Sequence, residues 1–379
     1  MDKAYLVLSD GTVFEGRAFG AEGDALGELV FTTGVVGYLE TLTDPCYAGQ
    51  IVVQTYPLIG NYGVITEDIQ GSCAPAGYVV REICDTPSNF RSQGDLNTYL
   101  KAQGIPGICG IDTRQLTRIL RDKGVMNACI CREIPEDLSP IEAFTVPSAE
   151  EMAGVVGTAL LPSTEKNEKP RLFRWLARLL GGRKKAAQEA PKPQFRVTLI
   201  DYGSTAGIRR QLEMRDCEVT VVPCNTAAES ILNGSPTGIV LSDGPGDPAG
   251  NPIGLEELKK LVGKAPIFGV GLGHQMLALA MGGKTAKLPY GHRGANQPVT
   301  ALGGGNTYIT AQNHGYVVEN NSVPMGKVFM VNANDQTCEA IEYPEKKAFS
   351  VQFHPETCTG PVNALFLYDR FITMMGGKK

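Results

Sequence analysis

The sequence predicts an α/β protein with two domains, a strand-rich mixed N-terminal domain followed by a doubly wound domain. Three observations lead to this prediction. The chain of 379 residues is too long for one ordinary domain. Short apolar runs in the first part are separated by glycines, and after residue 195 similar runs alternate with helical patterns. We place the domains at residues 1–150 and 196–379, joined by a linker at residues 151–195.

Composition excludes several classes of protein. A net charge of −5 argues against a nucleic-acid partner, which usually meets a basic face. Hydrophobic content is 42%, yet the sequence contains no apolar run of about 18 residues that could span a membrane. The N-terminal residues lack the apolar stretch of a signal peptide. The 10 cysteines form no C-x-x-C pair, so we expect a reducing, cytoplasmic location and no metal site.

The first elements have the pattern of a β-hairpin. The apolar run Ala4–Leu8 is followed by the turn residues Asp10-Gly11 and by a second run, Thr12–Glu15. Further elements are expected as two strands and one helix, at Leu29–Thr32, Gln50–Thr55 and Thr113–Lys123, the helix with Asp112 as its cap and Gly124 as its stop.

The linker contains a basic amphipathic segment. Apolar side chains fall at helical spacing with arginines on the other face, at Leu172, Phe173, Trp175, Leu176, Leu179 and Leu180. Such a helix can lie on a membrane or dock in a partner's groove. We favour a solvated linker whose short helix packs on its own protein, and do not favour membrane contact by residues 170–185.

The C-terminal part follows a β-α-β pattern. Strands are expected at Phe195–Ile200, Glu218–Val222, Gly238–Leu241 and Pro266–Val270, with helices such as Ile208–Met214 and Leu255–Val262 between them. This alternation indicates a parallel sheet with helices on both faces, which binds ligands at the carboxyl ends of its strands.

A glycine-rich turn after the last of these strands resembles a nucleophile elbow. Gly269 and Gly273 flank Gly271 between the strand and the helical run Met276–Met281, as in G-x-Nuc-x-G. Small neighbours let such a turn close, and backbone N–H groups at the helix start then face a developing oxyanion. The alternative is a dinucleotide-binding turn. It is weak, because His274 and Met276 stand where its third glycine would be.

Three other segments complete the candidate site. An apolar strand ends in His354-Pro355-Glu356, and in extended chain the residues at i and i+2 share a face, so Glu356 can orient the His354 ring. The loop at residues 241–248 follows a predicted strand and contains Gly244-Pro245-Gly246. The polar loop at residues 312–316 carries amide and aromatic groups. Each of these, taken alone, could be an ordinary surface turn.

Together these segments resemble the class I glutamine amidotransferase domain, with its G-x-C-x-G-x-Q elbow and H-P-E site. The whole chain except residues 163–194 resembles the small-subunit family of carbamoyl phosphate synthetase. The stretches that carry this resemblance include Gly27–Phe31, Leu42–Pro45, Ile59–Asn61, Gly110–Arg114 and Gly291–Asn296.

The resemblance implies a glutaminase that passes ammonia to a large synthetase subunit, which uses ATP and bicarbonate to make carbamoyl phosphate for arginine and pyrimidine synthesis. It implies His354 as base and Glu356 as its orienting residue, with an oxyanion hole at the amides of Gly244 and Leu272. It places glutamine against eight residues, Cys46, Gly244, Gly246, Leu272, Gln275, Asn313, Gly315 and Tyr316. No cofactor is expected in this chain, because ATP and Mg would bind the large subunit.

The departures from the family pattern fall in the same site. Gly271 stands at the nucleophile position, Cys46 replaces a serine, Asp243 replaces an asparagine, and the loop at residues 201–207 lacks the family's lysine and asparagine.

Since glycine offers no thiolate, we expect a well-folded subunit with little or no glutaminase activity, in a complex that depends on ammonia. The alternative is a non-catalytic structural or regulatory pseudo-glutaminase subunit, and a weaker one is a stand-alone regulator. Cys46 and Cys358 are the nearby thiols that could replace the missing nucleophile, but only by an accidental alignment with the oxyanion hole.

Overall fold

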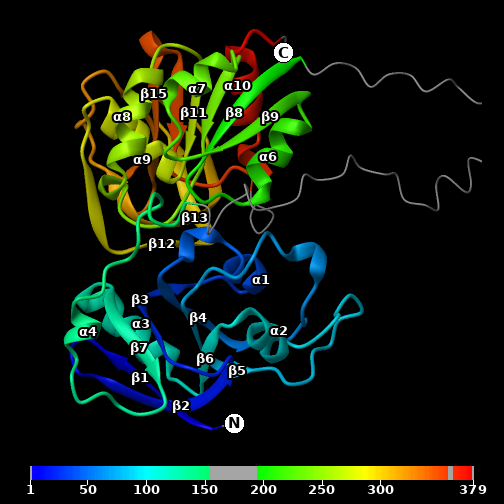
Figure 1. Ribbon diagram of the computed structural model, residues 1–379, viewed down its shortest axis with the longest axis vertical. Helices are drawn as coiled ribbons and strands as arrows, with labels where there is room; N and C mark the ends of the chain where they lie inside the picture. The colour runs from blue at the N-terminus through cyan, green and yellow to red at the C-terminus, as the bar shows by residue number, and fades with distance from the viewer. Residues whose placement is uncertain (1, 154–193, 357–361, 378–379) are drawn as a thin grey trace, which may run out of the picture.

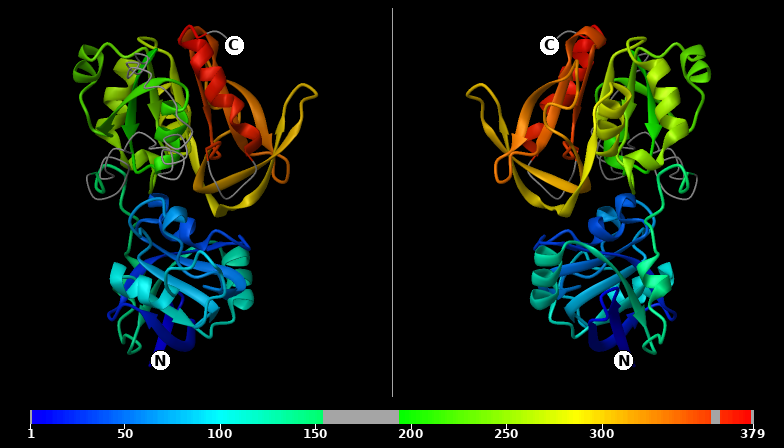
Figure 2. Two further views of the ribbon diagram at one scale, coloured as in Figure 1. Left: turned by 90° about the vertical axis from the view of Figure 1, so that its right-hand side faces the viewer. Right: turned by 90° about the vertical axis from the view of Figure 1, so that its left-hand side faces the viewer.

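The chain folds into two domains with different sheets, one above the other in Figure 1. The computed structural model describes residues 2–153, 194–356 and 362–377. Views from the two sides show the same two-part arrangement (Figure 2). The predicted fold class, a strand-rich mixed domain followed by a doubly wound one, is therefore confirmed. The predicted amphipathic segment around residue 175 lies outside the described residues.

The N-terminal sheet closes on itself as a barrel. Its strands are β1 (Lys3–Leu8), β2 (Val13–Gly20), β3 (Ala25–Thr32), β4 (Gln50–Ile59), β5 (Gly77–Ile83), β6 (Pro106–Cys109) and β7 (Met126–Cys131), in the order β1-β2-β6-β5-β4-β3-β7. The predicted hairpin is β1–β2, in which Leu6 pairs with Phe14. Its turn is fixed by Asp10, whose carboxylate accepts the Thr12 N–H at 3.0 Å, and by Gly11 at φ 83°.

The domain that contains the barrel also includes four α-helices, α1 (Tyr38–Leu42), α2 (Leu96–Gln103), α3 (Thr113–Lys123) and α4 (Ser139–Glu142), among its described residues. The bounds of α3 are those predicted. Asp112 caps it by accepting the Gln115 N–H at 3.0 Å, and Gly124 follows its last residue with a positive φ of 89°.

The C-terminal domain, as far as it is described, is built on a nine-stranded sheet. Its strands are β8 (Phe195–Asp201), β9 (Cys217–Pro223), β10 (Gly238–Leu241), β11 (Ile267–Val270), β12 (Thr285–Ala301), β13 (Thr307–Val318), β14 (Lys327–Asn332), β15 (Cys338–Tyr343) and β16 (Ala348–Val351). Strands β16, β11, β10, β8 and β9 run parallel, whereas β15, β14, β12 and β13 extend the sheet antiparallel. The prediction of a parallel sheet is thus right for one half and incomplete for the other.

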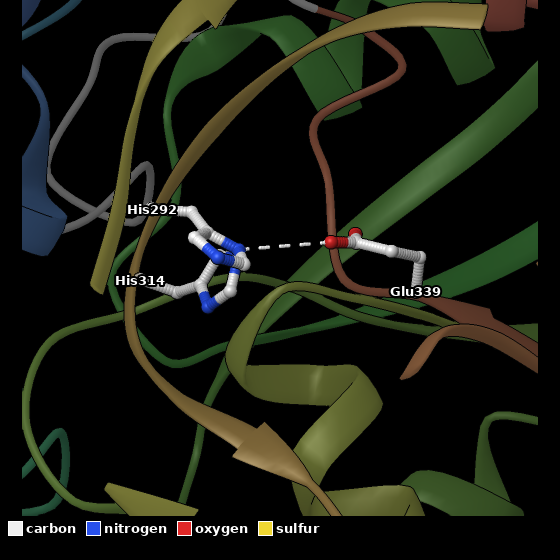
Figure 3. Close-up of side chains that lie close together, drawn as sticks. All are labelled: His292, His314 and Glu339. Atoms are coloured by element: carbon white, nitrogen blue, oxygen red, sulfur yellow. Dashed lines mark ion pairs between the residues drawn. The ribbon is translucent and has the colours of Figure 1, made fainter. Parts of the chain in front are cut away.

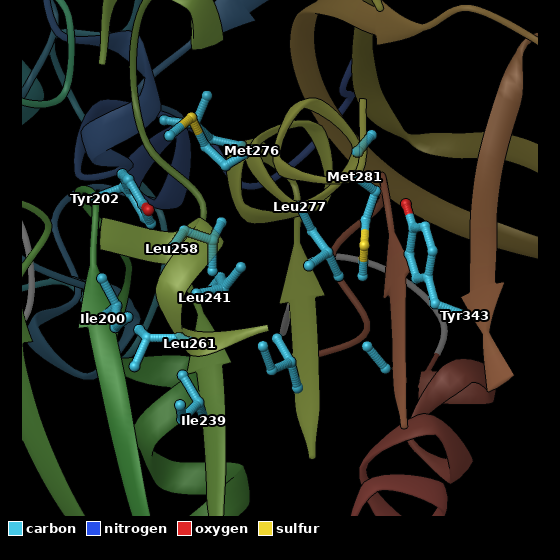
Figure 4. Packing of buried hydrophobic residues seen from close by; sticks show 14 of the residues in the cluster. Ile200, Tyr202, Ile239, Leu241, Leu258, Leu261, Met276, Leu277, Met281 and Tyr343 are labelled. Atoms are coloured by element: carbon cyan, nitrogen blue, oxygen red, sulfur yellow. The ribbon is translucent and has the colours of Figure 1, made fainter. Parts of the chain in front are cut away.

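Helices cover both faces of the parallel half. They are α6 (Ala206–Glu213), α7 (Ala228–Asn233), α8 (Pro252–Leu261), α9 (Leu272–Ala280) and α10 (Phe366–Met374). Because neighbouring strand residues point to opposite faces, Ile239 and Leu241 of β10 pack with α8 and α9 while Val240 packs with α6 and α10. Figure 4 shows the first of these layers, with Leu258 and Met276 among the helical side chains over the strands.

The long β12–β13 hairpin lies on the side of its domain that faces the barrel (Figure 1). The Val125 N–H, just before β7, donates to the Pro289 carbonyl of β12 at 2.7 Å. Lys287 of β12 pairs with Glu28 of β3 at 2.5 Å, and the Glu28 side chain is only 9% exposed. The hairpin and the barrel therefore form one continuous wall at the domain junction.

No helix in the described ranges is long and apolar enough to cross a membrane.

The core of the C-terminal domain provides a stability test. Phe268 of β11 stacks on Phe349 with ring centroids 4.5 Å apart and meets Tyr368 edge-on at 5.4 Å. Phe268→Ala should lower the free energy of unfolding by about 3–5 kcal/mol, because it leaves a cavity between aromatic rings. Urea unfolding followed by circular dichroism measures this. Phe90→Ala is the control, since that ring is 97% exposed, and an equal loss in both variants would contradict the assigned packing.

Candidate active site

The predicted elbow is present where β11 turns into α9. Gly271 joins them with φ 55° and ψ −113°, a backbone conformation that side-chain-bearing residues rarely adopt. A Cβ atom on Gly269 would lie 2.7 Å from the Gly273 carbonyl oxygen, and one on Gly273 would lie 2.5 Å from the Leu241 Cβ. The turn can close this tightly because both flanking residues are glycine.

The His-Pro-Glu segment brings an oriented imidazole to the same edge of the sheet. It follows β16, the neighbour of β11, and the His354 N–H donates to the Ala311 carbonyl of β13 at 2.9 Å. His354 Nδ1 lies 3.1 Å from Glu356 Oε1, the contact predicted from their i, i+2 spacing. Tyr368 of α10 donates its hydroxyl to the other Glu356 oxygen at 3.2 Å, which fixes the carboxylate.

Two backbone amides beside the elbow converge on one carboxylate oxygen. The Leu272 N–H, at the start of α9, donates to Asp243 Oδ1 at 2.6 Å, and the Gly244 N–H donates to the same atom at 2.8 Å. These are the two amides assigned to the oxyanion hole by resemblance. Hydrogen bonds to a charged group contribute about 1.5–3 kcal/mol each, so the two amides hold the Asp243 side chain firmly.

The other Asp243 oxygen contacts the imidazole. Oδ2 lies 2.8 Å from His354 Nε2, although within the described residues the two atoms do not align for a linear hydrogen bond. Burial lowers the pKa of His354, but the carboxylates of Asp243 and Glu356 outweigh burial and raise this pKa well above its usual value. His354 therefore lies between two carboxylates, which favour its protonated form and oppose its use as a proton acceptor.

A cavity of about 510 Å³ opens beside this pair, between the two domains. That volume is typical of a small-molecule site, for which roughly 300–1,000 Å³ is usual. All eight residues expected to contact glutamine line it: Cys46, Gly244, Gly246, Leu272, Gln275, Asn313, Gly315 and Tyr316. The barrel contributes Glu28 and Gln50 to the same wall, so the site needs both domains.

Amide side chains in the cavity are held by protein partners. Gln275 Nε2 donates to the Tyr316 carbonyl at 2.8 Å and to Gln352 Oε1 at 3.0 Å. Asn313 Nδ2 donates to Asp44 Oδ2 of the barrel at 2.7 Å. Burial raises the pKa of Asp44, partly offset by the nearby positive charge of His354. These contacts fix the cavity wall before any ligand binds.

Arg293 is a wall residue that the sequence analysis did not assign. It is 5% exposed, donates from Nη1 to the Tyr290 carbonyl at 2.9 Å, and its Nε has no hydrogen-bond partner among the described residues. Burial lowers its pKa. The family-like stretch Gly291–Asn296 contained it, but nothing in the spacing distinguished a cavity arginine from a surface one.

Cys46 lies at the cavity but is not activated. Burial, followed by the charges of Asp243 and Asp44, raises the pKa of its thiol well above the usual value. Since the thiolate is the nucleophile, a thiol in this setting is inert. Cys358 lies outside the described residues.

A buried His–His–Glu cluster stands behind the cavity wall (Figure 3). His292 Nδ1 lies 3.8 Å from Glu339 Oε1, and His314 is close to both. The side-chain atoms of this cluster that could bind a metal ion already have protein partners. Gln312 bonds to His314 Nε2 at 3.1 Å and to Glu339 Oε2 at 2.9 Å, Asn332 donates to Glu339 Oε1 at 3.2 Å, and His314 Nδ1 meets a β13 carbonyl at 2.8 Å. Burial raises the pKa of Glu339 to about 8. We interpret the cluster as a hydrogen-bonded support for β13.

The elbow, the oriented histidine and the paired amides define the C-terminal half as a class I glutamine amidotransferase domain. The family model "Glutamine amidotransferase class-I" matches residues 198–374, and the model "Carbamoyl-phosphate synthase small chain, CPSase domain" matches residues 6–130. The chain belongs to the carbamoyl phosphate synthase small chain family.

Relatives with that name match almost end to end. The small chain from Bacillus cereus (strain ATCC 10987 / NRS 248) is 44% identical over 98% of this chain and 96% of its own length. The one from Listeria monocytogenes serotype 4b (strain F2365) is 44% identical over 100% of this chain and 98% of its own. A putative GMP synthase protein from Thermoplasma acidophilum has a similar structure over 48% of this chain and 94% of that one, at 21% identity and a TM-score of 0.42, which is too low to support a conclusion.

The ion pair at Asp243 gives a pH-dependent prediction. A histidine whose pKa is raised by folding stabilises the protein fully below its unfolded pKa of about 6.5, and this contribution is lost as pH rises through the folded pKa. We therefore expect stability to fall as pH rises above neutral. Asp243→Asn should lower the pKa of His354 and reduce this loss. NMR titration of the imidazole, assigned with His354→Gln, measures the His354 pKa, and urea unfolding at several pH values measures the stability. An unchanged His354 pKa in Asp243→Asn would rule out the pairing.

Proposed function

We propose that this chain acts as the small subunit of a carbamoyl phosphate synthase that uses ammonia, because its own glutaminase reaction is absent. The observation that carries the proposal is Gly271, which stands at the elbow without a side chain. Thiolate attack on the glutamine amide needs a sulfur atom at this point. Removing the nucleophile from a catalytic triad lowers the rate by about 10⁶-fold in a serine protease, and a loss of this order is expected here.

The surrounding groups support the same proposal. His354 lies between Asp243 and Glu356, which raise its pKa and favour its protonated form, so it is poorly suited to act as a general base. Cys46, whose thiol lines the cavity, has a raised pKa that favours its neutral form. Both groups are therefore unsuited to replace the missing nucleophile or to activate one.

The cavity favours a role in binding. Its lining is assembled from both domains, and its amide side chains are held in place by protein partners. Glutamine is the ligand we propose for it. ATP and Mg²⁺ would bind the large subunit, the partner that family membership implies, and the product would enter arginine and pyrimidine synthesis.

A second candidate is a structural or regulatory pseudo-glutaminase. It is favoured by the contrast between a preserved cavity and a blocked catalytic centre. In this role glutamine would bind without reacting and alter the large subunit's rate with ammonium. The two candidates differ in whether added glutamine changes the rate at saturating ammonium.

The test is carbamoyl phosphate formation by this chain in complex with its large subunit, with glutamine or ammonium as the nitrogen source. We expect formation with ammonium and no glutamate release from glutamine, because no side chain can form the acyl-enzyme. A family member that carries a cysteine at the elbow is the positive control. Glutamate release at the control's rate would overturn the proposal.

A further inference from the structure

Gly271 and Asp243 occupy one another's space. A Cβ atom built on Gly271 would lie 2.1 Å from the Asp243 carboxyl carbon, 2.3 Å from Oδ1 and 2.4 Å from Oδ2. Real Cβ atoms do not approach other heavy atoms this closely. The Asp243 carboxylate can therefore reach its observed position only because residue 271 has no side chain.

The Asp243 backbone is also fixed. The Ser242 hydroxyl donates to the Asp243 carbonyl at 2.7 Å and accepts the Tyr202 N–H at 2.8 Å. The Gly273 N–H donates to the Ser242 carbonyl at 2.9 Å, which ties this loop to the first turn of α9. Asp243 is 4% exposed, so no solvent competes for its carboxylate. The side chain is a built part of the site.

We propose that the Asp243 carboxylate is an internal ligand of the oxyanion hole, coupled to Gly271, and that it blocks glutamine chemistry independently of the missing nucleophile. The inference rests on the proposed function, because the hole is defined by that reaction. Oδ1 takes both amide N–H groups that would stabilise the oxyanion, and Oδ2 pairs with the imidazole that would act as base. The Asp243 side chain thus occupies the place of the substrate's carbonyl oxygen and also the place of the Cβ atom of a nucleophile at position 271.

This coupling changes what a restored nucleophile would do. A cysteine at position 271 must displace the Asp243 carboxylate before its own Cβ fits. The displaced anion would leave two amide hydrogen bonds and an ion pair with His354. Until the carboxylate moves, the oxyanion hole stays occupied by Asp243 and the imidazole of His354 stays paired with it. Gly271→Cys alone should therefore remain a poor glutaminase, contrary to the simple expectation that one cysteine repairs the site.

The test compares Gly271→Cys with Gly271→Cys/Asp243→Ala, each in complex with the large subunit. Alanine removes all three atoms that would contact the new Cβ and empties the hole. Since losing a single oxyanion-hole donor costs about 10²–10³-fold in rate, we expect glutamate release at least about 10²-fold faster from the double variant. Intact mass after acid quenching should show a glutamyl adduct only on the double variant.

Two further variants keep the test decisive. Gly271→Cys/Asp243→Asn removes the charge but keeps the shape, so it serves if the alanine variant does not fold, and it should react faster than Gly271→Cys. Gly271→Cys/Glu257→Ala is the control, because the Glu257 carboxylate of α8 accepts the Ala228 N–H at 2.7 Å instead of an oxyanion-hole amide and lies outside the cavity lining. It should react at the rate of Gly271→Cys.

The outcomes separate the two proposals. If Gly271→Cys releases glutamate as fast as its folded Asp243 double variants, Asp243 does not block the hole and this inference is overturned, whereas the proposed function stands. If the Glu257 control gains as much as the Asp243 variants, a general loosening of the domain explains the gain, and the inference is again overturned. Glutamate release by the natural complex at an ordinary rate would instead overturn the proposed function.

Discussion

The arrangement of this site depends on one buried carboxylate, that of Asp243. Taking such an anion out of water is costly unless donors and a counter-charge replace its hydration. Asp243 receives both, from the Leu272 amide at the start of α9, from the amide of the adjacent Gly244 and from the His354 ring. The Leu272 amide is in place because the chain turns at Gly271, and the ring is in place because Glu356 and Tyr368 hold it. The glycine turn, the histidine and the α10 helix therefore support one another through this single anion.

The domain junction explains why the cavity keeps its shape around such a centre. Asp44 of the barrel holds Asn313, and Glu28 holds Lys287, so the wall from β12 and β13 is anchored from outside its own domain. Behind that wall, hydrogen bonds that join His314 and Glu339 hold β13 in place. Because its wall is supported from two sides, the cavity can keep its shape even where glutamine is not hydrolysed.

Much of this architecture follows from sequence pattern, and the limits of that prediction are physical. The α3 helix was predicted to the residue because its cap and stop are local signals. The elbow and the His354–Glu356 contact follow from fixed spacings on strand and turn. The antiparallel half of the sheet was missed, since strand direction is set by distant pairing. The role of Asp243 was also missed, although its replacement of an asparagine was noted. Apart from the adjacent Gly244, its partners are distant along the chain, and only the fold shows that it fills the space left at Gly271.

The mutual exclusion of the Asp243 carboxylate and a side chain at Gly271 also has a historical meaning. A lineage that carries both Gly271 and Asp243 would gain little glutaminase activity by replacing Gly271 first. A side chain at position 271 would collide with the Asp243 carboxylate, so selection would not favour that change. The first backward step at Asp243 frees a hole that no nucleophile uses. Under the proposed function, recovery of glutamine hydrolysis would need changes at both positions, while the cavity would remain free to adapt to other ligands.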